Sequence, residues 1–111
     1  MTIDLPWPPP TLSPNARCHW AKRHRAFRAY KKATWWLLYP KRRHLSQFRR
    51  FKITFLPPDH HRRDLDNMIA SFKAGGDALS DAIGIDDSEF SYEFARGEPV
   101  KNGNIILEGI S

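Results

Sequence analysis

The spacing of the apolar residues changes along the chain, and this change limits the folds that it can adopt. Between Trp20 and Tyr39 apolar residues recur every three or four positions opposite a basic face, which predicts a helix that ends at Pro40. Between Phe51 and Phe55 they alternate with polar residues, which predicts a half-buried strand. Both periods in one short chain indicate a domain that mixes helices and strands.

Four further elements follow from the same patterns. Apolar residues at helical spacing predict a helix over Leu65–Ala82, although Gly75 and Gly76 lower helix propensity in its middle. Strands are predicted over Thr2–Leu5, Glu89–Arg96 and Asn104–Ile110, the last two joined through an Asn-Gly turn signal. The predicted order β-α-β-α-β-β favours an α+β two-layer sandwich, in which a mixed sheet carries two helices on one face.

Length and composition predict one domain spanning residues 1–111. Cys18 is the only cysteine, so an internal disulfide cannot form, and the longest apolar run, Ala33–Tyr39, is far shorter than the ~20 residues that cross a bilayer. We therefore expect a soluble cytoplasmic protein with no membrane partner. Because small domains bury a limited share of their surface and often gain stability by pairing, we expect a homodimer.

Five prolines lie between Pro6 and Pro14, directly after the first predicted strand. Proline fixes φ and lacks a backbone donor, so this segment is expected to form a stiff extended loop. A PxxP partner-binding motif is the alternative, and it is less favoured beside a strand.

Charge is divided unevenly between the two halves of the chain. Residues 1–50 hold twelve Lys and Arg but one acid, a net of +11, whereas residues 51–111 hold six basic and eleven acidic residues, a net of −5. A basic half of this kind suits a polyanion such as nucleic acid, although a solvated basic surface is the simpler alternative.

The segment Asp59–Asn67, DHHRRDLDN, concentrates acidic and basic residues just after a predicted strand. Asp64 and Asp66 are two positions apart, so an extended backbone would point both carboxylates the same way. Helix capping explains one such carboxylate, and turn chemistry is the alternative for Asp86 and Asp87. Oxygen ligands of this kind suit Mg²⁺, which would let an acidic pocket accept phosphate.

A zinc site is not favoured. The adjacent His60 and His61 diverge in an extended chain, and His19 and His24 miss the i, i+4 helical spacing. Cys18 is the single available thiolate.

Several motifs together resemble those of the RusA-type Holliday junction resolvases of bacteria and their phages. The resemblance rests on LPWPP at Leu5–Pro9, RRDLDN at Arg62–Asn67, a lysine in the following helix, DAL at Asp77–Leu79, and the acidic pair Asp86-Asp87 before a strand. These motifs run in order through nearly the whole chain.

The resemblance implies a Mg²⁺-dependent endonuclease, with Mn²⁺ able to substitute, that works as a homodimer and nicks four-way DNA junctions symmetrically. It also implies that Asp64, Asp66 and Asp87 are the essential metal-binding carboxylates, with a smaller role for Asp86. Lys73 takes the place of the catalytic lysine, but it stands seven residues after Asp66 instead of the family's four, which shifts it about 4.5 Å along a helix. A surface ion pair between Lys73 and Asp77 is the alternative.

The expected function is resolution of Holliday junctions in DNA recombination and repair. The residues expected to contact DNA are Arg62, Arg63, Arg25, Arg28, Lys31 and Lys32. A non-enzymatic basic DNA-binding module and a less selective nuclease for branched DNA remain the alternatives. The catalytic expectation requires acidic side chains from distant segments to converge, and Asp87 on the far side of the fold from Asp64 would contradict it.

Overall fold

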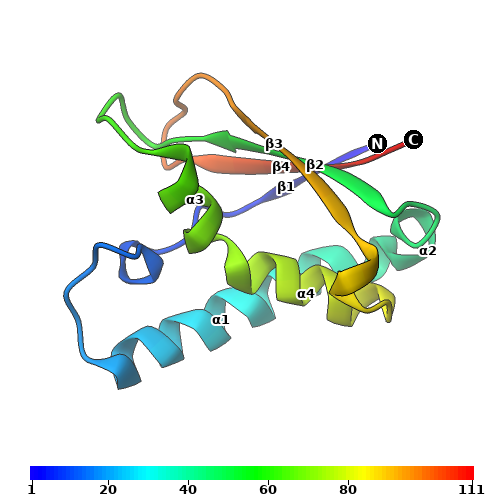
Figure 1. Cartoon of the computed structure of the whole chain (residues 1–111), viewed down its shortest axis with the longest axis horizontal. Helices are drawn as coiled ribbons and strands as arrows, with labels where there is room; N and C mark the ends of the chain where they lie inside the picture. Colours follow the sequence, from blue (N-terminus) through cyan, green and yellow to red (C-terminus); the bar gives the residue numbers. More distant parts are fainter.

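The computed structural model describes residues 1–111, in which helices cover one face of a four-stranded sheet (Figure 1). The strands are β1 (Thr2–Leu5), β2 (Arg50–Leu56), β3 (Ser91–Arg96) and β4 (Asn104–Ile110). The helices are α1 (Trp20–Leu38), α2 (Arg42–Leu45), α3 (Leu65–Ser71) and α4 (Lys73–Ile83), with single 3₁₀ turns η1 (Pro10–Leu12), η2 (Tyr39–Lys41) and η3 (Asp87–Glu89). The predicted α+β two-layer sandwich with a mixed sheet is confirmed.

The strands lie in the order β1-β4-β2-β3. β4 pairs antiparallel with both β1 and β2, whereas β3 pairs parallel with β2 at the sheet edge. The Asn-Gly signal does form a turn between β3 and β4, because Asn102 and Gly103 have φ of 66° and 71°. The two strands that this turn connects are not neighbours, since β2 lies between β3 and β4 in the sheet.

The alternation in β2 places its apolar residues in the core. Phe51, Ile53 and Phe55 are fully buried beneath the helices, while Lys52 and Thr54 lie on the other face of the sheet. Ile105 and Leu107 of β4 continue the same buried layer. The half-buried strand predicted from the sequence is thus confirmed, and the face away from the helices is partly polar.

The predicted helix over Leu65–Ala82 is two helices with a break at Phe72. The break does not fall at the two glycines, which lie inside α4. Phe72 is buried and packs edge-on against Tyr30 and Phe55, and a Cβ at Gly75 would overlap its ring. The glycine therefore makes room for the aromatic side chain that interrupts the helix.

α1 confirms the predicted helix to within one residue at its C-terminus. The basic segment after Pro40 is helical in part, since it contains α2. None of the helices combines the length and the hydropathy that a membrane-spanning helix requires.

The connection from β2 to β3 decides which segments can meet. Because the two strands are parallel, the chain leaves β2 at one end of the sheet and enters β3 at the other, after passing through α3 and α4. Figure 1 shows α3 and the loop before β3 at opposite ends of the fold.

Candidate functional site

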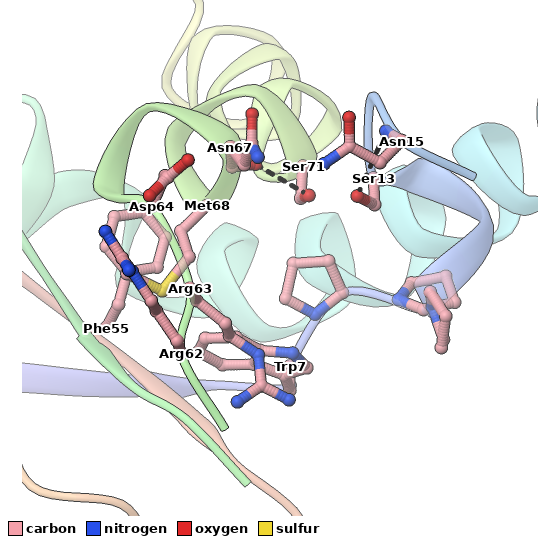
Figure 2. Close-up of a pocket in the computed structure, with 13 residues that line it drawn as sticks. Trp7, Ser13, Asn15, Phe55, Arg62, Arg63, Asp64, Asn67, Met68 and Ser71 are labelled. Atoms are coloured by element: carbon pink, nitrogen blue, oxygen red, sulfur yellow. Dashed lines mark hydrogen bonds between the residues drawn. The ribbon is translucent and has the colours of Figure 1, made fainter. Parts of the chain in front are cut away.

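A cleft of about 470 Å³ lies between the proline-rich loop and the N-terminal part of α3. One wall comes from Trp7 and the three prolines that follow it, and the other from Arg62, Arg63, Asp64 and residues of α3 (Figure 2). Two of the motifs noted in the sequence, LPWPP and RRDLDN, therefore meet in one cleft although more than 50 residues separate them.

Side chains from three elements fix the proline-rich wall. The Tyr30 hydroxyl on α1 donates a 2.6 Å hydrogen bond to the Pro6 carbonyl, and burial raises the pKa of Tyr30. The Trp7 ring packs edge-on against Phe55 at 6.2 Å, and a Cβ at Gly103 would come within 2.8 Å of it. The cleft is thus preformed on this side, although the predicted extended loop is interrupted by the 3₁₀ turn η1.

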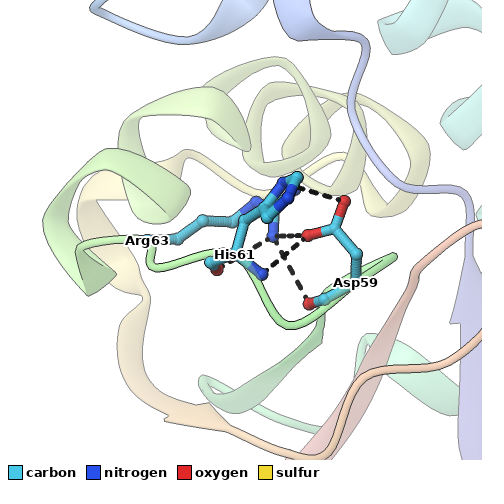
Figure 3. A network of polar contacts seen from close by, with 3 residues as sticks. All are labelled: Asp59, His61 and Arg63. Atoms are coloured by element: carbon cyan, nitrogen blue, oxygen red, sulfur yellow. Dashed lines mark hydrogen bonds and ion pairs between the residues drawn. The ribbon is translucent and has the colours of Figure 1, made fainter.

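Arg63 organises the loop between β2 and α3 (Figure 3). Its guanidinium donates to the Asp59 carboxylate at 2.6 Å and to the His61 carbonyl at 3.2 Å. The hydrogen bond from Arg63 to the Asp59 carboxylate is the main cause that lowers the pKa of Asp59 to about 2. A hydrogen bond from the His61 backbone amide is the second cause. The guanidinium also lies 6.0 Å from the Trp7 ring centroid, so Arg63 joins the two walls.

Arg62 contrasts with its neighbour. It lines the same cleft, its side chain is exposed, and it makes no ion pair. Of the two arginines in this loop that are expected to contact DNA, Arg62 therefore has a free guanidinium, whereas Arg63 is already engaged by Asp59.

Asp64 precedes the first turn of α3 in the N-cap position. Its carboxylate accepts no hydrogen bond from the helix amides, is exposed, and lines the cleft. Asp66 is also exposed, in the first turn of α3, but it does not line the cleft. The capping explanation for Asp64 is thus not supported, and its oxygens are available to an external ligand.

Asp87 lies at the other end of the fold, in η3 just before β3. Burial is the main cause that raises the pKa of Tyr92 to about 12, and the negative charges of Asp87 and Asp77 add to it. Asp87 therefore lies near this residue of β3. No group of three His, Cys, Asp or Glu side chains is arranged to hold a metal ion. Because β2 and β3 are parallel, a single chain does not bring Asp87 to Asp64 and Asp66, and the expectation that these three carboxylates converge is wrong for one chain.

The remaining acidic and catalytic candidates have local partners. Asp86 accepts a 2.9 Å hydrogen bond from the Ser88 amide, which lowers the pKa of Asp86. Lys73 donates to Asp77 at 2.6 Å on the surface of α4 and does not line the cleft. The Lys73–Asp77 pair that the spacing allowed is the arrangement found.

The four α1 residues that were expected to contact DNA lie together along a shallow groove of about 510 Å³. Arg25, Arg28, Lys31 and Lys32 line it with Ala29, Trp35 and Asp81. Lys31 forms a 2.8 Å ion pair with Asp81, which raises the pKa of Lys31. The groove shares no residue with the cleft, so the basic residues form two separate surfaces.

Four neutral polar residues of the cleft were not predicted as site residues. They are Ser13, Asn15, Asn67 and Ser71. Asn67 belongs to the RRDLDN motif, which was a usable signal. The other three carry none, because only the packing of the proline-rich loop against α3 brings them to the cleft.

An uncharacterized protein from Xylella fastidiosa (strain Temecula1 / ATCC 700964) is 37% identical over 116 aligned positions, which cover 96% of this chain and 73% of that protein. No protein-family model matches the sequence.

Proposed function

This chain belongs to the same family as the Xylella fastidiosa protein, and we propose that it is a Mg²⁺-dependent endonuclease that resolves four-way DNA junctions by paired nicks. The observation that carries the proposal is the cleft itself. It unites two motifs that resemble the RusA-type resolvases, and it presents an unpaired carboxylate, Asp64, beside an unpaired guanidinium, Arg62.

Asp64 and Asp66 suit Mg²⁺, because this ion is commonly held by one or two carboxylates together with water and phosphate oxygens. Both carboxylates are exposed, and neither forms an ion pair. When bound, Mg²⁺ would supply an activated water and neutralise charge on the leaving oxygen. Arg62 would hold the phosphate in place beside the two carboxylates.

A homodimer reconciles this site with the position of Asp87. The β2-to-β3 connection separates Asp87 from Asp64 within one chain, so Asp87 could join the pair only from a second chain. In a two-fold dimer this arrangement would repeat, giving two equivalent sites for two equivalent strands of a junction. We therefore propose that Asp64 and Asp66 act with Asp87 of the partner subunit.

The test is cleavage of a labelled four-way junction with and without Mg²⁺, and with Mn²⁺ in its place. We expect paired, symmetric nicks that carry 5′-phosphates and require the metal. Asp64→Asn should abolish cleavage but preserve or tighten junction binding, because it removes repulsion between the carboxylate and phosphate.

Glu93→Gln is the matched control. It removes one negative charge from an exposed position of β3, on the face of the sheet that the helices do not cover, and should leave cleavage unchanged. Retained cleavage by the Asp64→Asn protein would contradict the proposal.

A DNA-binding module without catalytic activity is the first alternative. It predicts salt-sensitive binding and no response to Mg²⁺. The absence of a capping hydrogen bond to Asp64 weighs against it, since capping was the structural role that this alternative gave to the acid.

A nuclease without junction selectivity is the second alternative. Competition between an unlabelled linear duplex and the labelled junction separates it from the proposed function. Equal competition by both DNAs would favour this alternative.

A further inference from the structure

The polar side chains of the cleft fall into two groups (Figure 2). Arg62, Arg63 and Asp64 are charged and lie toward the loop that follows β2. Ser13, Asn15, Asn67 and Ser71 are neutral and lie together on another side, where the proline-rich loop faces α3. Of these cleft residues, the proposed metal and phosphate chemistry uses only Arg62 and Asp64.

The neutral group keeps unused hydrogen-bonding capacity. The Ser13 hydroxyl oxygen accepts a hydrogen bond from the backbone amide of Asn15 at 3.3 Å. The Ser71 hydroxyl donates one to the backbone carbonyl of Asn67 at 2.9 Å. The side-chain amides of Asn15 and Asn67 make no hydrogen bond within the chain. Each of these amides can therefore offer two donors and one acceptor oxygen to a ligand.

This chemistry selects a particular kind of ligand. A phosphate would require cations, and none belongs to the neutral group. The Asp64 carboxylate, which also lines the cleft, would repel a phosphate. Paired donors and acceptors on Asn side chains instead match the edge of a nucleobase, which presents both kinds of group in one plane. Trp7 and the adjoining proline rings add an apolar wall against which a flat ring can lie.

The dimensions agree with such a ligand. The cleft measures about 470 Å³, within the range of about 300–1,000 Å³ that is usual for small-molecule sites. It is also preformed, because Tyr30, Phe55 and Arg63 hold the walls in place.

We propose that the neutral side of the cleft binds one unstacked nucleobase of a junction strand, next to the phosphate that Arg62 and Asp64 address. The inference rests on the proposed function and adds a base-specificity site to it. Bases at a branch point have lost part of their stacking and pairing, so they are the easiest to extrude. Contacts to phosphate position a nucleic acid, whereas contacts to a base edge select its sequence.

The first experiment measures unstacking directly and does not require cleavage. A four-way junction carries 2-aminopurine in place of one base at the branch point, and this base fluoresces more strongly when it leaves the stack. Asp64→Asn protein, which is expected to bind without cutting, should raise the fluorescence several-fold. Adding Asn67→Ala to this variant should suppress the rise while the protein still binds the junction.

Gln47→Ala provides a matched control, because it removes an exposed side-chain amide far from the cleft lining. It should leave the fluorescence rise unchanged. Asn15→Ala, in the exposed proline-rich loop, repeats the test from the other segment and guards against a folding defect in the α3 variant. No fluorescence rise on a bound junction would overturn the base site but leave paired nicking intact, whereas failure to bind or cut the junction would overturn both proposals.

The second experiment measures sequence preference with four junctions that differ only in the base beside the nick. The wild-type protein should prefer one base, and Asn67→Ala should reduce this preference by about tenfold. Arg62→Ala should instead weaken cleavage of all four junctions alike. An unchanged preference in Asn67→Ala protein would overturn the base site.

Free deoxynucleosides serve as competitors that distinguish a site for a base within a DNA strand from a site for a free nucleoside. If the cleft binds the base only as part of a DNA strand, they will not reduce the 2-aminopurine signal. Competition by one free deoxynucleoside would show instead that the cleft is a site for small nucleosides, and would overturn its assignment to the junction.

Discussion

Asp59 and Asp64 lie in one loop, but their surroundings fit them for different tasks. The Asp59 carboxylate is satisfied by Arg63 and by the His61 amide, so its charge is used to shape the loop. The Asp64 carboxylate has no such partner and faces the cleft. Arg63 is therefore best described as the residue that positions the loop, while Arg62 remains free for DNA.

The pH dependence of the loop follows from Asp59. Its pKa is about 2 in the folded protein and 3.8 without its partners, so its contribution to loop stability is complete above about pH 4. That contribution is lost as the pH falls through about 2. Carboxyl chemical shifts followed by NMR should give a titration midpoint near 2 for Asp59, and Arg63→Gln should raise it toward 3.8.

Lys101→Gln is the control for this titration, since it removes a positive charge from an exposed turn without touching Asp59. The Asp59 midpoint should not change in this variant. A midpoint near 3.8 in the wild-type protein would contradict the ion pair.

The two helices that follow β2 illustrate how a local pattern can mislead. Gly75 and Gly76 predicted a weak middle in one helix, but the interruption occurs at Phe72. Its ring reaches into the core between Tyr30 and Phe55. Residues distant in the sequence therefore set the position of the break, and periodicity alone could not locate it.

Alanine at each glycine should have opposite effects on stability. Gly75→Ala would place a methyl group in the Phe72 ring and should destabilise the fold by about 1–3 kcal/mol. Gly76→Ala meets only the Tyr92 hydroxyl at 3.7 Å, an ordinary contact, and should be neutral or stabilise by up to about 1 kcal/mol. Urea unfolding of both variants checks this, and equal effects would contradict the packing described for Phe72.

The basic groove on α1 has a measurable consequence for DNA binding. Arg25 and Arg28 line it without an ion-pair partner, whereas Lys31 is paired with Asp81. Replacing both arginines with Gln should reduce the slope of log affinity against log salt by about 2, because each phosphate contact contributes about 0.9. Lys52→Gln, on the other face of the sheet, should leave the slope unchanged.

An unchanged slope in the double variant would show that the α1 groove does not contact DNA. The groove would then be an ordinary solvated basic surface, as the sequence also allowed.

The parallel pairing of β2 with β3 accounts for the most informative difference between sequence and structure. The sequence predicted the fold class, the four strands and the position of Asp64 between a strand and a helix, because these depend on periodicity and on neighbouring residues. It did not predict that Asp64 and Asp87 would lie at opposite ends, because strand order depends on contacts across the chain. The sequence expectation that one chain gathers all three carboxylates is therefore not met.

Mixing two inactive variants tests whether two chains share a site. Asp64→Asn and Asp87→Asn proteins should each be inactive alone. In a mixed dimer with shared sites, one site carries both substitutions and the other carries neither, so the mixture should regain single-strand nicking. Continued inactivity after subunit exchange, verified by pull-down of differently tagged chains, would contradict the shared site.

The position of β4 has a consequence for how the protein is made. This strand comes last among the four in the sequence, yet it lies between β1 and β2 and contributes two fully buried residues, Ile105 and Leu107. Until a ribosome has released these residues, β1 has no neighbour with which to pair. The complete sheet can therefore assemble only after nearly all 111 residues have been translated. Until then the edge of β2 that will pair with β4 stays exposed, and the nascent chain must avoid aggregation through it.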